Sequence, residues 1–260
     1  MTGNIFVFKY DGMSLTIDKR INHNLRGMKK NSIIVLAALS LLGIAASCDT
    51  LVPEGGETDS KNTADLGLSV KWATCNLGAS SPEQSGNFYA WGETTPKTQF
   101  TWDNYKWTYE EKSSYGDIIL LRSKYNSKSN QGKVDNKTKL DPEDDAARSK
   151  LGGKWRMPTK AEFQELIDKC TWTLTSRSGV DGFEVKSKVN DNSIFLPLTG
   201  FYSQTDGYDG STLHHKDQGN LWVSDMDNTN TVTCYFKKGK PGSWWGTGRE
   251  QGMPIRPVSD

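Results

Sequence analysis

The fold of this 260-residue chain depends most on the stretch Gly152-Gly153-Lys154-Trp155-Arg156-Met157-Pro158-Thr159-Lys160-Ala161-Glu162-Phe163-Gln164-Glu165-Leu166. Trp155 and Met157 alternate with charged residues, as in a short half-buried strand, and Pro158 ends it because proline has no N–H for a ladder. Thr159 and Glu162 have the spacing of a capping box. The apolar residues that follow have helical spacing: Ala161, Phe163, Leu166, Ile167 and Cys170. We therefore predict a core helix, against which a β-rich remainder packs.

A second helix is predicted to begin at Asp141 and to end at the glycines 152 and 153. Asp141 can cap it, Pro142 suits the first helical position, and the acidic residues that follow favour the positive end of a helix dipole. Short strands are predicted at residues 66–74, 172–175, 183–189, 193–197, 221–224, 231–237 and 253–258. Residues 115–125 fit either a strand or a helix, and residues 200–218 and 238–252 are predicted to be loops.

The N-terminal region carries the pattern of an export signal. Met28-Lys29-Lys30 supplies positive charge, and an apolar run extends from Ile33 to Ala46. This run is shorter than the roughly 20 residues that a membrane-spanning helix needs. The small residues before Cys48 resemble a bacterial lipobox, which implies that residues 28–47 are a lipoprotein signal peptide and that Cys48 is lipidated. The alternative is an ordinary signal peptide followed by a chance cysteine.

The segments that flank this signal differ from the rest of the chain. Residues 1–27 show no clear period, and we predict that they precede the true start of translation at Met28. Residues 48–64 are rich in Pro, Gly, Glu, Thr and Ser, which indicates a flexible tether. The single predicted domain is residues 65–260. Residues 1–47 hold six of the 32 basic and two of the 31 acidic residues, so the mature chain has a net charge of −3. A partner that is a nucleic acid is therefore not expected.

The cysteines allow one disulfide inside the predicted domain. Cys75, Cys170 and Cys234 are an odd number, and export permits disulfides. We favour a Cys75–Cys170 disulfide, and we expect Cys234 to occupy a buried apolar position because its neighbours are apolar and aromatic. A zinc site is not expected, because the chain has no CxxC motif.

Several phrases of the sequence resemble one family when taken together. They are residues 65–76 (DLGLSVKWATCN), 89–93 (YAWGE), 155–159 (WRMPT), 192–197 (NSIFLP) and 255–258 (IRPV). The set resembles the Bacteroidetes "major paralogous domain" (FISUMP-type) lipoproteins over residues 62–260. That resemblance implies an α+β, C-type lectin-like fold, related to the formylglycine-generating enzymes. Such a fold packs two helices on short, mostly antiparallel strands that carry long loops.

The candidate ligand-binding residues lie in the two predicted loops of the C-terminal half. They are Tyr202, Tyr208, Trp244, Trp245 and Arg249. Two adjacent indoles in a Gly-rich segment are costly to leave in water unless they pack or bind. In a strand-like conformation they point to opposite faces, so that one packs in the core and the other is exposed to a sugar ring or a protein side chain. The alternative is that both pack back onto the sheet.

A calcium site is a weaker prediction. Asp225, Asp227 and Asn228 follow a predicted strand and could contribute oxygen ligands, of which Ca²⁺ takes 6–8. The Glu-Pro-Asn, Gln-Pro-Asp and Trp-Asn-Asp triplets of sugar-binding C-type lectins do not occur in this sequence. A solvated turn is therefore the preferred reading, and no cofactor is expected.

The sequence offers little for catalysis. It has no Gly-x-Ser-x-Gly elbow, and Cys234 is without a basic neighbour or a second nearby cysteine. We therefore predict a monomeric, non-catalytic lipoprotein at the outer membrane or cell surface, which binds a glycan or a protein through its C-terminal loops. The alternatives are a structural or assembly subunit of a surface appendage and, with less support, an enzyme of the formylglycine-generating type.

Overall fold

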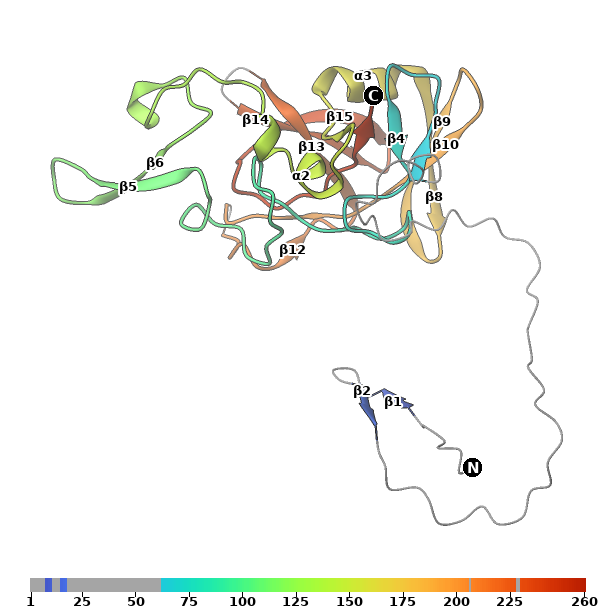
Figure 1. The fold of residues 1–260 in the computed structure, drawn as a ribbon, viewed down its shortest axis with the longest axis horizontal. Helices are drawn as coiled ribbons and strands as arrows, with labels where there is room; N and C mark the ends of the chain where they lie inside the picture. The colour runs from blue at the N-terminus through green and yellow to red at the C-terminus, as the bar shows by residue number, and fades with distance from the viewer. Residues whose placement is uncertain (1–7, 11–14, 18–61, 206, 228–229) are drawn as a thin grey trace, which may run out of the picture. The chain divides into compact units, whose positions relative to one another are not determined.

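The computed structural model describes residues 8–10, 15–17, 62–205, 207–227 and 230–260, and the chain divides into two units, Met1–Ile44 and Ala45–Asp260. In the first unit, β1 (Phe8–Tyr10) pairs with β2 (Leu15–Ile17) in antiparallel register (Figure 1). The predicted signal peptide and the predicted lipidation site at Cys48 lie outside the described residues. Across the described residues, no helix has the length and apolar character needed to cross a membrane.

One four-stranded sheet joins the two ends of the second unit. Its order is β3 (Thr63–Ala64), β4 (Lys71–Ala73), β16 (Val258–Ser259) and β7 (Trp155–Arg156). Val258 lies opposite Trp72 on one side and opposite Arg156 on the other. Ala64 also pairs with Trp72, so residues 63 and 64, which were predicted to end the tether, belong to this sheet.

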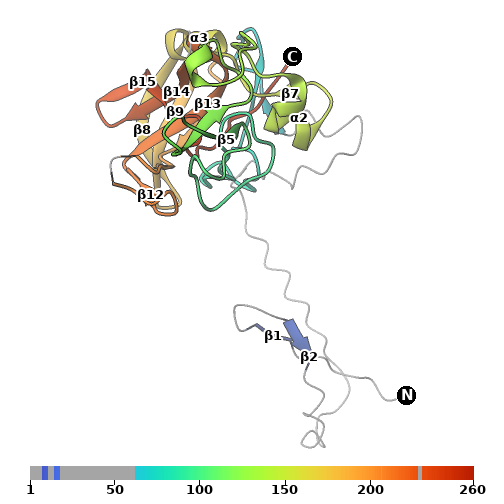
Figure 2. The same cartoon turned by 90° about the vertical axis from the view of Figure 1, so that its left-hand side faces the viewer.

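Two three-stranded antiparallel sheets hold most of the remaining strands (Figures 1 and 2). The first has the order β10-β9-β8 and contains β8 (Cys170–Arg177), β9 (Val180–Ser187) and β10 (Ser193–Pro197). The second has the order β13-β14-β15 and contains β13 (Gln218–Asp227), β14 (Asn230–Lys237) and β15 (Lys240–Thr247). Two hairpins complete the set: β5 (Thr108–Lys112) with β6 (Ile118–Arg122), and β11 (Phe201–Tyr202) with β12 (Leu213–His214).

Helix α3 (Lys160–Lys169) forms as its sequence predicts. The Thr159 side chain accepts from the Glu162 backbone N–H, and the Glu162 carboxylate accepts from the Thr159 N–H at 2.8 Å. Phe163 and Leu166 are fully buried against the sheets. The capping box and the buried face of this helix are therefore confirmed.

The other predicted helix is shorter than expected. Residues 141–151 split into a 3₁₀ turn, η2 (Pro142–Asp144), and a six-residue helix, α2 (Ala146–Leu151), while a further turn, η1 (Ser129–Gln131), lies upstream. The split occurs because Asp145, rather than Asp141, caps α2 by accepting from the Arg148 N–H at 3.0 Å. Gly152, with φ of 66°, ends α2.

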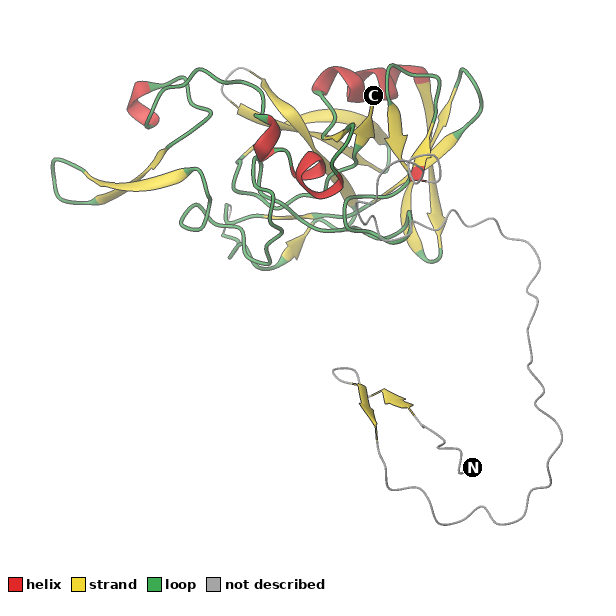
Figure 3. Cartoon of the chain, in the orientation of Figure 1, coloured by secondary structure: helices red, strands yellow, loops and turns green. Residues whose placement is uncertain are grey.

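The predicted α+β, C-type lectin-like fold is therefore wrong. Only about 12% of the residues that the structure describes are helical, one helix among them reaches seven residues, and the sheets are mostly antiparallel (Figure 3). The predicted loop at 238–252 is largely the strand β15, because Lys238 and Gly239 make a two-residue turn that returns the chain along β14. Gly239 has φ of 75°, a conformation that suits glycine.

Two apolar clusters form the main core. The larger lies between α3, the β8–β10 sheet and one face of the β13–β15 sheet, and includes Trp72 and Phe163, whose rings meet edge to face at 4.7 Å. The second surrounds Trp91, Tyr125 and Trp222. Trp222 shares a face of the β13–β15 sheet with Trp245, so the two clusters pack on opposite faces of this sheet and make it a rigid support.

Candidate functional site

The adjacent residues Trp244 and Trp245 lie on opposite faces of the β13–β15 sheet. Trp244 pairs with Cys234, packs against the main core and donates its indole N–H to Gln164 Oε1 at 2.8 Å. Trp245 pairs with Thr233 and remains 43% exposed. The prediction that one indole packs and the other is exposed is confirmed, because β15 alternates its side chains as a strand does.

The exposed indole belongs to a group of rings that we call the aromatic patch. It is formed by Phe201, Tyr208, His214, His215, Tyr235 and Trp245. Trp245 meets Phe201 edge to face at 5.8 Å and meets Tyr235 at 5.7 Å between ring centroids. His215 stacks on Phe201 with their planes 5° apart. The patch therefore unites the two segments that the sequence singled out, 200–218 and 238–252.

Tyr208 and the paired histidines form the outer part of the aromatic patch. The Tyr208 ring stacks on His214 with a centroid distance of 3.6 Å, and its hydroxyl lies 3.3 Å from His215 Nε2. Phe201 pairs with His214 across the β11–β12 hairpin. Gly200 begins this hairpin with φ of 66°, and a Cβ there would lie 2.3 Å from the His214 carbonyl oxygen. The close approach of these backbones requires glycine at this position.

Buried amides lie on the same face of the sheet as Trp245. Asn220 of β13 pairs with Tyr235, is fully buried, and has no hydrogen-bond partner for either side-chain atom among the described residues. The Gln218 Nε2 atom is also buried and has no hydrogen-bond partner among the described residues. A buried polar group without a partner costs roughly 1–3 kcal/mol, so these amides have hydrogen-bonding capacity that the fold itself does not use.

The turn between β14 and β15 adds positive charge beside the aromatic patch. The ammonium groups of Lys237 and Lys240 lie 5.8 Å and 5.4 Å from the centre of the Tyr235 ring. The hydrogen bond from the Lys237 ammonium to the Tyr235 side chain raises the pKa of this lysine. The rim of the patch is therefore polar and cationic, while its centre is aromatic.

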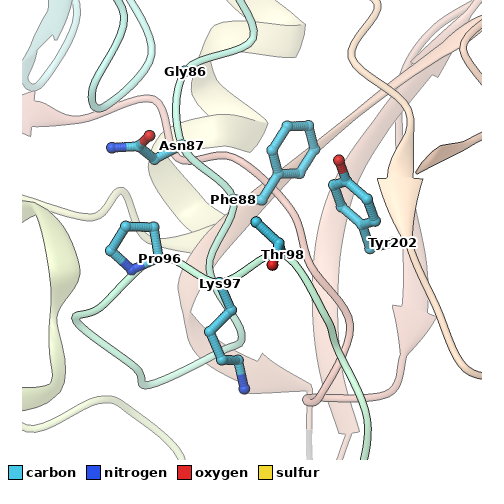
Figure 4. Close-up of a pocket in the computed structure, with 7 residues that line it drawn as sticks. All are labelled: Gly86, Asn87, Phe88, Pro96, Lys97, Thr98 and Tyr202. Atoms are coloured by element: carbon cyan, nitrogen blue, oxygen red, sulfur yellow. The ribbon is translucent and has the colours of Figure 1, made fainter. Parts of the chain in front are cut away.

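Tyr202 does not join the aromatic patch. It lines a separate pocket of about 540 Å³ with Gly86, Asn87, Phe88, Pro96, Lys97 and Thr98 (Figure 4). Its ring meets Phe88 edge to face at 4.9 Å, and the two aromatic side chains lie together with Thr98 in the close-up. The Lys97 ammonium points away from them and contacts Glu93 at 3.0 Å. Phe201 and Tyr202 are neighbours in β11, yet Phe201 belongs to the aromatic patch and Tyr202 lines this pocket.

Arg249 is buried and cannot contact a ligand on the aromatic patch. Its guanidinium donates to the Tyr125 carbonyl at 3.0 Å and lies 5.9 Å from the Trp91 ring centre. Burial lowers the pKa of Arg249. The next residue, Glu250, is also fully buried, and its carboxylate has no hydrogen-bond partner among the described residues. Burial raises the pKa of Glu250 to about 7.

The weak calcium candidates are used to hold helix α3. Asp225 Oδ1 accepts from the Lys160 backbone N–H at 2.8 Å, and Asp227 pairs with the Lys160 ammonium at 2.8 Å. Asn228 lies outside the described residues. These contacts join β13 to the first turn of α3, so the two carboxylates already have partners within the fold.

A second cluster of acidic residues is already paired with a lysine. Asp141, Glu143 and Asp144 have oxygen atoms within 4.8 Å of one another. The Lys124 ammonium lies 2.6 Å from both Asp141 and Asp144 and 3.9 Å from Glu143. A lysine therefore occupies the position that a metal ion would need.

The predicted disulfide between Cys75 and Cys170 is not formed. Cys170 and Cys234 are both free and buried. Burial raises the pKa of Cys170 to about 11 and also raises the pKa of Cys234. Neither thiol is poised to form a nucleophilic thiolate at neutral pH.

Sequence reasoning missed the rings that complete the aromatic patch, Phe201 and Tyr235. Tyr235 could have been found from the alternation of residues 231–237, which places it on the face of Thr233. Phe201 gave no local signal, because its position depends on the β11–β12 hairpin. No family model, curated protein or solved structure matches this chain.

Proposed function

We propose that this protein is a non-catalytic recognition module that binds a carbohydrate at the aromatic patch. The observation that carries the proposal is the exposure of Trp245 at the centre of a group of rings on a rigid sheet. A large exposed aromatic side chain on a fixed support is typical of a binding surface rather than of core packing.

A sugar fits the chemistry of this surface better than an apolar ligand does. The C–H face of a sugar ring can stack on the Trp245 indole, while its hydroxyl groups need donors and acceptors close by. The imidazoles of His214 and His215, the Tyr208 hydroxyl and the lysines of the β14–β15 turn supply such groups around the ring. Small-molecule sites commonly combine an aromatic wall with a few polar groups in this way.

The cellular location of the protein is part of the same proposal. The export pattern at residues 28–47 and the cysteine at position 48 support a lipid-anchored protein at the outer membrane or cell surface. The resemblance of residues 62–260 to the FISUMP-type lipoproteins supports the same location. A surface lipoprotein with a carbohydrate-binding face would meet glycans outside the cell.

A second candidate function, a subunit of a surface assembly, is favoured by one observation. The hairpin of β5 and β6 exposes four large apolar or aromatic side chains, none of which belongs to the aromatic patch: Tyr115, Ile118, Ile119 and Leu120. Enzymatic activity has less support, because the buried Glu250 and Arg249 are closed off from solvent.

The test is glycan-array binding by the full chain and by a Trp245→Ala variant. The matched control is Tyr115→Ala, which removes a 92% exposed aromatic residue outside the aromatic patch. We expect the first substitution to lower affinity at least about tenfold and the second to leave it unchanged. Binding that survives Trp245→Ala, or a folded chain that binds no glycan, would refute the proposal.

A further inference from the structure

The β5–β6 hairpin is a two-stranded sheet, and within the described part of the chain no third strand pairs with it along most of its length. It projects from the other sheets of its unit (Figure 1). An isolated hairpin is at best marginally stable in water. Its β6 strand nevertheless exposes a run of apolar side chains, with Ile118 at 64% exposure and Ile119 and Leu120 also exposed. An open, apolar edge strand of this kind pairs readily with another strand.

The two edges of the hairpin differ in character. β5 carries the charged residues Glu110, Glu111 and Lys112, and charged side chains are a common means of keeping an edge strand unpaired. β6 carries Ile118 to Leu121, without a charge until Arg122. The β6 edge is therefore the unprotected one.

The hydrogen-bond pattern shows which backbone groups face the open edge of β6. Ser123 donates to the Trp107 carbonyl and Ser113 donates to the Asp117 carbonyl, so hydrogen-bonded pairs alternate along the hairpin and include Ile119 and Leu121. Ile118 and Leu120 consequently direct their N–H and C=O groups outward. Arg122 also directs its backbone groups outward, and its carbonyl accepts a hydrogen bond from the Lys133 N–H at 2.8 Å.

This pattern is self-complementary. A two-fold axis that passes midway between Ile119 and its copy, perpendicular to the plane of the hairpin, sets Ile118 opposite Leu120 of a second copy, and the converse pair forms on the other side of the axis. Both pairs consist of residues whose backbone groups face outward, so each can exchange two hydrogen bonds. Opposite residues then share a face, so Ile118 and Leu120 of both copies come together. A closed two-fold interface of this kind is the commonest form of homo-oligomer.

We propose that the β6 edge pairs with the β6 edge of a second copy of this chain, in antiparallel register about Ile119. The result is a four-stranded sheet in the order β5, β6, β6 and β5, with the charged β5 strands outermost. This pairing is independent of the aromatic patch, and it proposes a dimer in place of the expected monomer.

The first test is cross-linking of an Ile119→Cys variant of the full chain. In the paired register, residue 119 faces its own copy with a Cα separation of about 4.5 Å, which lies within disulfide range. The control is Glu111→Cys, since Glu111 pairs with Ile119 within the hairpin but would lie about 14 Å from its copy, three strand spacings away. A rapid covalent dimer of the first variant alone is expected. Equal cross-linking of both variants, or of neither, would overturn the proposed register.

The second test is the oligomeric state, measured by analytical ultracentrifugation across a concentration series without added ligand. Leu120→Lys places a charge on the β6 edge, whereas Glu110→Lys changes its partner across the hairpin on the β5 edge. We expect the first to weaken dimerisation at least about tenfold and the second to leave it unchanged. A native chain that stays monomeric at the highest concentration, with the circular dichroism of a folded β protein, would refute the proposal.

Discussion

Trp245 and Phe201 meet edge to face, with ring centroids 5.8 Å apart and planes at 84° to each other. This contact joins a strand of the three-stranded sheet to the β11–β12 hairpin, and it holds the exposed indole in one orientation. Aromatic pairs of this geometry contribute roughly 0.5–1.5 kcal/mol beyond the area they bury. The Trp245 side chain is therefore already ordered before a ligand stacks on it, so binding costs less conformational entropy and the affinity is higher.

The two adjacent tryptophans should have opposite effects on stability and binding. Trp244→Ala removes a side chain that packs on the core and its hydrogen bond to Gln164, so we expect the free energy of unfolding to fall by about 2–4 kcal/mol. Trp245→Ala removes a half-exposed side chain and should lower it by about 1 kcal/mol or less. Urea unfolding measures both values. An equal or larger loss for Trp245→Ala would show that this residue is mainly structural.

Glu250 should make the stability of the protein depend on pH. Burial raises its pKa in the folded chain from 4.5 to about 7, so the folded state holds a proton that the unfolded state has lost between these values. The free energy of unfolding should therefore fall as pH rises from about 4.5 to about 7, by up to about 3 kcal/mol.

The matched variant for this prediction is Glu250→Gln, which keeps the shape and removes the titration. It should be more stable than the native chain at pH 7.5 and should differ little from it at pH 4.5. Urea unfolding at both pH values gives the comparison. A native chain whose stability relative to Glu250→Gln does not change with pH would mean that Glu250 has a charge partner in solution.

Calcium should have no effect on folding. Asp225 and Asp227 are paired with the backbone and ammonium groups of Lys160, and Lys124 lies among the acidic residues near Asp141. We expect the melting temperature to be the same in EDTA and in millimolar Ca²⁺, as measured by differential scanning calorimetry. A saturable rise with Ca²⁺ that Asp225→Asn abolishes would show that the ion displaces Lys160.

The features that the sequence predicted well depend on neighbouring residues. The capping box of Thr159 and Glu162 forms because its partners are three residues apart, and the opposite orientation of Trp244 and Trp245 follows from strand alternation. The strand β10 was likewise predicted at its observed residues, 193–197.

The features that failed depend on contacts between distant segments. The helix expected at residues 141–151 lost its first turn partly because Lys124 and Tyr125 bind the Asp144 carboxylate. The Cys75–Cys170 disulfide was favoured because it would tie the first strand to the end of the core helix, but the sequence carries no information on the distance between these two residues, and Cys170 is free. The resemblance supplied the fold class, and the sheets overturned it.

The candidate site was predicted in part. Residues Tyr208 and Trp245 do belong to one surface, whereas Tyr202 faces a separate pocket and Arg249 is buried. The direction of a side chain in a two-residue strand such as β11 depends on register, and a sequence with long polar loops does not reveal that register.

The position of β16 between β4 and β7 has a consequence for synthesis of the protein. Val258 and Ser259 are synthesised after both β4 and β7, yet they lie between these two strands in the sheet. That sheet therefore cannot close until β16 has left the ribosome. A variant truncated before Val258 would leave β4 and β7 without the strand that joins them.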